Sequence, residues 1–151
     1  MGLDLFDQTI ALLSDLDAAG VEYALAGALA LAVHGVPRAT TDIDLLIPPA
    51  ALESALAVAA RRGFVFAALP MRFDDGMEVR RVSMIEGEET LTLDLLLVND
   101  NLREVWASRQ RVPVGEGAIW VLSLDGLVRM KSWAARPQDL ADLRRLEDLD
   151  R

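Results

Sequence analysis

The sequence contains no cysteine, one histidine and one tyrosine, and aromatic residues occupy only 5% of its 151 positions. Without cysteine the chain has neither a disulfide framework nor a thiolate metal site, which fits a reducing compartment. Positive charge is also scarce. The chain has 15 Lys and Arg and 24 Asp and Glu, which gives a formal net charge of −9. This balance argues against a broad, sequence-independent grip on nucleic acid, although it leaves room for a small basic patch.

Long apolar segments and targeting signals are missing as well. The longest uncharged run, residues 23–37, is too short to cross a bilayer, and the N-terminus lacks the basic region of a signal peptide. The length and the 52% hydrophobic content suit one domain with a proper core. We therefore expect a single cytoplasmic domain over residues 1–151 that does not enter a membrane.

Hydrophobic periodicity and turn residues predict an alternation of helices and strands. The turn-like segment 86–89 joins two strands into a hairpin, Ser123 is a plausible N-cap, and residues 64–69 form a strand or a loop. The expected helices are 3–19, 28–33, 51–62, 99–108, 124–135 and a last one to about 149, and the expected strands are 21–26, 41–47, 77–85, 90–98 and 118–121.

The strand 41–47 carries the strongest chemical signal. Alternation places Asp42 and Asp44 on one face and Ile43, Leu45 and Ile47 on the other. Two carboxylates this close repel each other, so one must take up a proton or a cation must lie between them, and this strand contains no Lys or Arg. Paired hard oxygen ligands suit a divalent cation such as Mg²⁺.

Other polar residues occupy positions where an apolar residue would be ordinary. Asp94 lies in a leucine-rich strand and needs a partner, either in a site or as a structural contact to the backbone or an arginine. Gly27 joins a strand to a helix, where unpaired backbone N–H groups favour an anion. Lys131, the only lysine beside fourteen arginines, lies on the inward stripe of its helix, where it either reaches the edge or meets an anion. His34 contacts a phosphate or, more simply, bonds to the backbone.

The order of these residues resembles the nucleotidyltransferase fold of the DNA polymerase beta superfamily. That signature has a glycine turn, then Asp-x-Asp on the next strand and a third carboxylate on a later strand, as at Gly27, Asp42, Asp44 and Asp94. The abortive-infection branch, which includes toxins of type IV toxin–antitoxin systems, is still more similar through two runs. The matching residues are His34-Gly35, Arg38, Thr40, Asp42 and Asp44 in the first run, and Lys131, Ala134, Arg136, Asp139 and Asp142 in the second.

The resemblance implies an α/β (α+β) fold with a mixed central sheet flanked by helices and with two C-terminal helices. It implies transfer of NMP from an NTP to a hydroxyl of a protein, RNA or small-molecule acceptor, with Mg²⁺ or Mn²⁺ as cofactor. RNA is the acceptor that the net charge disfavours, and an antitoxin-like protein partner is compatible with the family. A homodimer is compatible with the 52% hydrophobic content of so small a chain. The metal ligands would be Asp42, Asp44 and Asp94, and these three residues together with Lys131 would be the catalytic residues. The nucleotide would contact Gly27, Ala28, Arg38, Thr40 and Lys131.

One departure keeps two other interpretations open. Ala28 stands where the family has Ser or Gly, so no hydroxyl is available there to hold a phosphate. The chain is then either a catalytically degenerate module that binds nucleotide or metal, or a module of the same fold that binds a protein partner.

Overall fold

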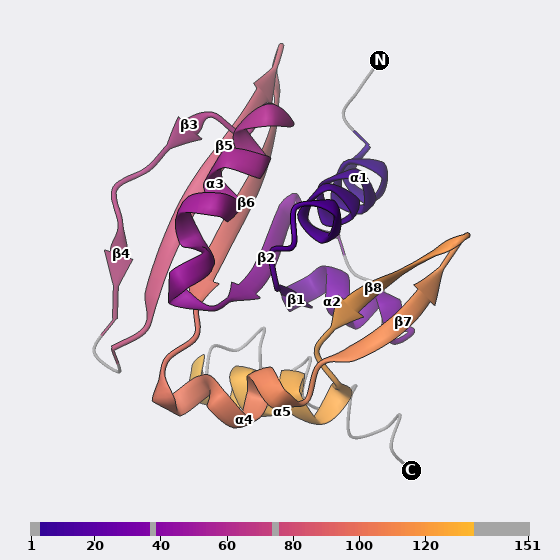
Figure 1. The fold of residues 1–151 in the computed structure, drawn as a ribbon, viewed down its shortest axis with the longest axis vertical. Coiled ribbons are helices and arrows are strands. Elements are labelled where there is room, and N and C mark those ends of the chain that lie inside the picture. The colour runs from indigo at the N-terminus through magenta and orange to yellow at the C-terminus, as the bar shows by residue number, and fades with distance from the viewer. Residues whose placement is uncertain (1–3, 37–38, 74–75, 135–151) are drawn as a thin grey trace.

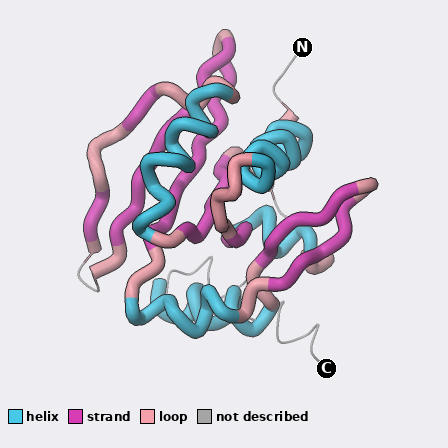
Figure 2. The backbone as a smooth tube through the Cα atoms, in the orientation of Figure 1, coloured by secondary structure: helices cyan, strands magenta, loops and turns pink. Residues whose placement is uncertain are grey.

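The computed structural model describes residues 4–36, 39–73 and 76–134, with residues 131–134 described through their backbone alone. Arg38 and the expected last helix with Arg136, Asp139 and Asp142 lie outside these residues. Figure 1 shows helices packed on a long, twisted sheet, and Figure 2 shows the same backbone by secondary structure. Within the described part of the chain, no helix has the length and apolarity needed to span a membrane.

The sheet has eight strands and mixed polarity. Seven follow the order β3-β5-β6-β2-β1-β8-β7, and β4 pairs with β5. The central strand β2 is antiparallel to β1 and parallel to β6, while β1 is parallel to β8. The strands are β1 (Ala24–Ala26), β2 (Asp42–Ile47), β3 (Phe66–Ala67), β4 (Met71–Arg72), β5 (Glu78–Glu86), β6 (Glu89–Leu97), β7 (Gln110–Val114) and β8 (Gly117–Val121).

Each helix begins where the sequence provides a cap or a turn. The Asp4 side chain accepts a hydrogen bond from Asp7 N at the start of the first helix, and Asn99 and Ser123 cap later ones through Leu102 N and Gly126 N. The helices are α1 (Leu5–Ala18), α2 (Gly27–Val33), α3 (Leu52–Arg61) after a 3₁₀ turn at Pro49–Ala51, α4 (Arg103–Ala107) after a 3₁₀ turn at Asp100–Leu102, and α5 (Leu124–Ala134).

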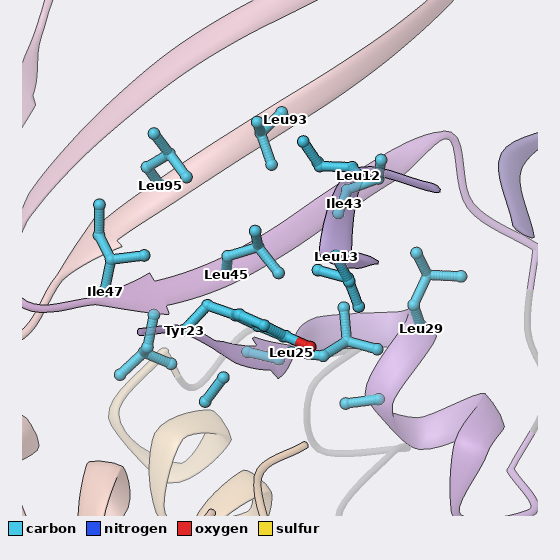
Figure 3. Packing of buried hydrophobic residues seen from close by; sticks show 14 of the residues in the cluster. Leu12, Leu13, Tyr23, Leu25, Leu29, Ile43, Leu45, Ile47, Leu93 and Leu95 are labelled. Atoms are coloured by element: carbon cyan, nitrogen blue, oxygen red, sulfur yellow. The ribbon is translucent and has the colours of Figure 1, made fainter. Parts of the chain in front are cut away.

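Core residues cover one face of the central strands, and the other face of β2, which carries Asp42 and Asp44, is buried only at its Leu46 end. Figure 3 shows side chains from β2, β6, β1 and α1 packed together on the covered face. Ile43, Leu45 and Ile47 are fully buried, which confirms the alternation expected for this strand. Burying such a side chain contributes about 1.5–3 kcal/mol to the free energy of folding. The buried residues therefore fix which way β2 faces, and with it the direction in which Asp42 and Asp44 point.

The mixed α/β architecture confirms the expected fold class, and the differences from the expected elements are local. The strand expected over 21–26 begins only at Ala24, because Val21 N still bonds to the Leu16 carbonyl at the end of α1. The segment 64–69 contributes the two-residue strand β3. The strands β4 and β7 were not predicted. β7 contains Pro113 and lies at the sheet edge, where a missing N–H costs little.

Candidate active site

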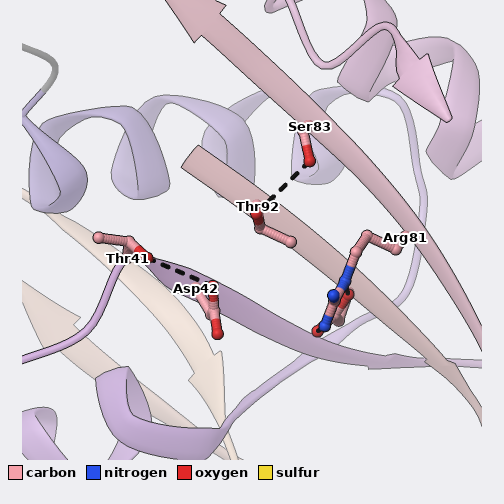
Figure 4. Close-up of polar contacts among 6 residues, drawn as sticks. Thr41, Asp42, Arg81, Ser83 and Thr92 are labelled. Atoms are coloured by element: carbon pink, nitrogen blue, oxygen red, sulfur yellow. Dashed lines mark hydrogen bonds and ion pairs between the residues drawn. The ribbon is translucent and has the colours of Figure 1, made fainter. Parts of the chain in front are cut away.

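The strand β2 presents two carboxylates on the face opposite the core. Asp42 and Asp44 are half-buried and alternate with fully buried Ile43 and Leu45. The backbone N–H of Asp42 donates to Thr40 Oγ1 at 3.0 Å, and Thr41 Oγ1 lies 3.5 Å from Asp42 Oδ1, as Figure 4 shows for Thr41. Thr40 therefore supports the start of the carboxylate strand.

The pairing of β2 with β6 places the third carboxylate, Asp94, beside the other two. β2 and β6 run parallel with Asp44 opposite Asp94 and Asp42 opposite Thr92. Opposed residues in a sheet point to the same face and their Cα atoms are roughly 5 Å apart. The register thus brings Asp42, Asp44 and Asp94 onto one face of the sheet.

Gly27 lies against the carboxylate strand at the turn from β1 into α2. Its φ of +65° belongs to the left-handed region, and a Cβ added there would lie 2.1 Å from Asp44 Oδ2. Ala26, just before it, is the register partner of Asp44. Only a glycine allows both the backbone conformation and this close approach.

Arg81 is the site residue that the sequence reasoning missed. It lies opposite Asp94 in the β5–β6 hairpin, and its Nε and Nη2 donate to the two oxygens of Asp94 at 2.7 and 3.0 Å. Asp94 is only 8% exposed, so this bidentate ion pair supplies the partner that a buried carboxylate needs. Hydrogen bonding and charge attraction from Asp94, with smaller contributions from Asp42 and Asp44, raise the pKa of the Arg81 guanidinium.

The donor set partly fits a divalent cation. Asp42 and Asp44 offer the hard oxygen ligands that Mg²⁺ and Mn²⁺ prefer. Both oxygens of Asp94 are engaged by Arg81, and within residues 4–36, 39–73 and 76–134 no group of three or more His, Asp and Glu side chains is placed to hold a metal ion. Coordination by all three aspartates stays a prediction, in which Asp94 either shares its oxygens with Arg81 or releases it.

The remaining expected residues are placed less completely. Ala28 follows Gly27 in the first turn of α2, the backbone of Lys131 lies in α5, and Arg38 is outside the described residues. His34 Nε2 donates to the carbonyl of Leu122 at 2.8 Å, so the backbone interpretation of the only histidine is confirmed. Trp106 and Trp120 enclose the Arg109 guanidinium, with its Cζ 4.2 and 4.5 Å from their ring centroids, and act as structural anchors.

Two depressions in the described surface are lined by other residues than the three aspartates. One of about 300 Å³ is apolar and lies between α1, α2 and the β7–β8 hairpin, with Leu25 and Ile119 in its lining. Leu25 pairs with Leu45, whereas its neighbour Ala26 pairs with Asp44, so this depression is on the core face of the sheet. It does not adjoin the carboxylates.

Comparison with solved structures identifies the architecture around the carboxylates. The chain superposes on TM1012 from Thermotoga maritima, whose assignment as a nucleotidyltransferase is provisional, with a TM-score of 0.64 and 16% identity over 95% of this chain and 92% of that one. The fold is that of a nucleotidyltransferase. ANT(2'')-Ia, solved with adenylyl-2''-tobramycin, matches with a TM-score of 0.60 and 18% identity over 93% of this chain and 87% of that one.

JHP933 from Helicobacter pylori matches with a TM-score of 0.55 and 18% identity over 94% of this chain and 64% of that one. No protein-family model matches the sequence, and no curated protein matches it at a significant level. At these low identities, the structural similarity shows a shared fold and no more.

Proposed function

We propose that this chain is a divalent-metal-dependent nucleotidyltransferase that transfers NMP from an NTP to an acceptor hydroxyl. The observation that carries the proposal is the register of β2 with β6, which gathers Asp42, Asp44 and Asp94 on one face of a nucleotidyltransferase-fold sheet. Asp42 and Asp44 would hold Mg²⁺ or Mn²⁺, with Asp94 joining them once it leaves Arg81. The bound metal would supply charge neutralisation of the triphosphate and of the leaving oxygens.

The other site residues would accept a proton or bind the nucleotide. In an in-line transfer, a bond forms between the acceptor oxygen and the α-phosphorus, the bond from that phosphorus to the bridging oxygen breaks, and pyrophosphate leaves. Asp94 would accept the proton of the acceptor hydroxyl. Gly27 and Ala28 would offer backbone N–H groups, and Arg38, Thr40 and Lys131 would bind the triphosphate.

The acceptor and the biological setting are further parts of the proposal. The acceptor is a hydroxyl of a protein, an RNA or a small molecule, and ANT(2'')-Ia, whose structure contains an adenylylated tobramycin, supports the small-molecule class. The similarity of the two sequence runs to the abortive-infection branch supports a type IV toxin–antitoxin role with a protein partner. Growth inhibition on expression, relieved by a co-expressed neighbouring protein, would test that role.

The decisive test is pyrophosphate release from each of the four NTPs with Mg²⁺ or Mn²⁺, together with nucleotide binding. We expect both activities in the wild type and their loss in Asp44→Asn and Lys131→Ala. Asp125→Asn is the matched control, because Asp125 is exposed and pairs with Arg129 in α5. Activity that survives in Asp44→Asn, in a protein folded like the wild type, would contradict the assignment.

A second candidate function has its own support. Ala28 removes the turn hydroxyl, and Arg81 neutralises the third carboxylate, so a nucleotide-binding protein without transfer activity fits both observations. Saturable Mg²⁺-nucleotide binding that depends on Asp44, without pyrophosphate release on any acceptor, would favour this candidate. Absence of nucleotide binding, with a stable protein partner, would favour a partner-binding module instead.

A further inference from the structure

The carboxylate face contains its own cation in addition to its aspartates. Register places Asp44, Asp94 and Arg81 in one row across β2, β6 and β5. The adjacent row contains Asp42, Thr92 and Ser83, and Figure 4 shows Ser83 and Thr92 side by side with Arg81 nearby. Arg81 therefore belongs to the same polar surface as the three carboxylates.

The neighbouring arginine shows that this placement is specific. Arg80 projects to the opposite face of β5, where its Nε bonds to Glu78 Oε2 at 2.8 Å. The two arginines are consecutive and both half-buried, but only Arg81 contacts Asp94. The chain thus offers two chemically identical residues, one at the carboxylate face and one away from it.

A guanidinium on Asp94 and a divalent cation at the same carboxylates oppose each other. The two hydrogen bonds from Arg81 to Asp94 join a guanidinium to a carboxylate, so they are of the strong, charge-assisted kind. Asp94 is also buried, which shields these bonds from water. A metal ion that recruits Asp94 lies close to the positive charge of Arg81 and draws on the same two carboxylate oxygens as these hydrogen bonds, so the two cations weaken each other's binding. The Arg81 side chain is 43% exposed, so it can turn away from Asp94 without leaving a buried cation behind.

We propose that Arg81 is a positioning residue that occupies the third carboxylate in the absence of substrate and moves to the nucleotide phosphates when metal and nucleotide bind together. This inference rests on the proposed function. A triphosphate offers the released guanidinium an anionic partner that matches its fork. Metal binding would then be weak without nucleotide and strong with it. The nucleotide phosphates draw the Arg81 guanidinium away from Asp94, and the metal in turn takes its place at the carboxylates, so each ligand favours the binding of the other.

The experiment measures Mn²⁺ binding by electron paramagnetic resonance, with and without a non-hydrolysable ATP analogue, so it does not depend on turnover. In Arg81→Gln we expect Mn²⁺ alone to bind roughly tenfold more tightly than in the wild type, because a nearby positive charge and a competing ligand are both removed. The analogue should then tighten Mn²⁺ binding less than it does in the wild type. Arg80→Gln should leave both quantities unchanged.

Two further variants guard against trivial outcomes. Arg81→Lys keeps the charge and loses the fork, so it should tighten Mn²⁺ binding less than Arg81→Gln, and it covers the case in which the glutamine variant does not fold. Asp94→Asn in the Arg81→Gln background should reverse the gain. Equal Mn²⁺ affinities in the wild type and a folded Arg81 variant would overturn this inference alone. Absence of Mn²⁺ binding in every protein, even with the analogue, would overturn the proposed function as well.

Discussion

The contact between Gly27 and Asp44 yields a quantitative prediction. In Gly27→Ala the new Cβ would lie 2.1 Å from Asp44 Oδ2, 2.9 Å from its Cγ and 3.1 Å from its Cβ. Rotation of the carboxylate relieves only the first of these contacts, since Cγ and Cβ are fixed more directly by the strand. We expect Gly27→Ala to displace Asp44 and to disrupt the site as well as the fold.

The magnitude combines two costs. An alanine at positive φ costs about 1–2 kcal/mol, and forcing an extra carbon into a packed contact costs about 1–3 kcal/mol. Gly27→Ala should thus lower the free energy of unfolding by about 2–5 kcal/mol. At about 2–4 °C per kcal/mol for a domain of this size, the midpoint of thermal unfolding should fall by roughly 4–20 °C.

The matched control is Gly87→Ala in the β5–β6 turn. Gly87 has a φ of +62°, close to that of Gly27, but a Cβ there meets nothing within 4 Å. The free energy of unfolding of Gly87→Ala should therefore fall only by the about 1–2 kcal/mol that an alanine at positive φ costs. This variant should retain Mn²⁺ and nucleotide binding. Urea unfolding and Mn²⁺ titration measure the two effects. Equal losses of stability in the two variants, with binding retained in both, would refute the close-contact reasoning.

Two other predictions concern residues outside the carboxylate face. Burial raises the pKa of Tyr23 to about 12, so its neutral form stabilises the fold fully below pH 10, and about 2–3 kcal/mol is lost as the pH rises from about 10 to about 12. Phenolate absorbance should report this single tyrosine, and Tyr23→Phe should abolish the dependence; an ordinary titration near pH 10 in the folded protein would contradict it. His34→Ala should cost about 1 kcal/mol in urea unfolding by removing the bond to Leu122 and leave nucleotide binding intact. Loss of nucleotide binding in a fully stable His34→Ala protein would instead assign His34 to the site.

Local patterns in the sequence were sufficient to predict the carboxylate strand. Alternation of Asp42 and Asp44 with fully buried residues specifies which face of β2 is polar, and a one-residue shift would bury both carboxylates. Ser123 was predicted as a cap because its hydroxyl can accept a backbone N–H close in sequence, and it does so from Gly126. Such features depend on neighbours a few residues away.

Arg81 was missed because its role depends on pairing between strands. Arg80 and Arg81 are equivalent in composition, and only the hairpin register decides which one meets Asp94. The signal was present in the turn: Glu86 pairs with Glu89, and five residues further along each strand Arg81 pairs with Asp94. Counting back from the predicted turn would have placed the two together. β7 gave no comparable signal, since Pro113 and two polar residues weaken its strand pattern.

The position of β2 in the sheet also matters while the chain is being synthesised. β1 and β2 follow each other closely in the chain, but β6, the partner on the other edge of β2, is made only after β5. An open apolar edge strand is a template for aggregation, and charged side chains on such a strand prevent that pairing. Asp42 and Asp44 are on this strand from the start, so we expect the residues that we assign to chemistry in the finished protein to oppose such pairing in the nascent one as well.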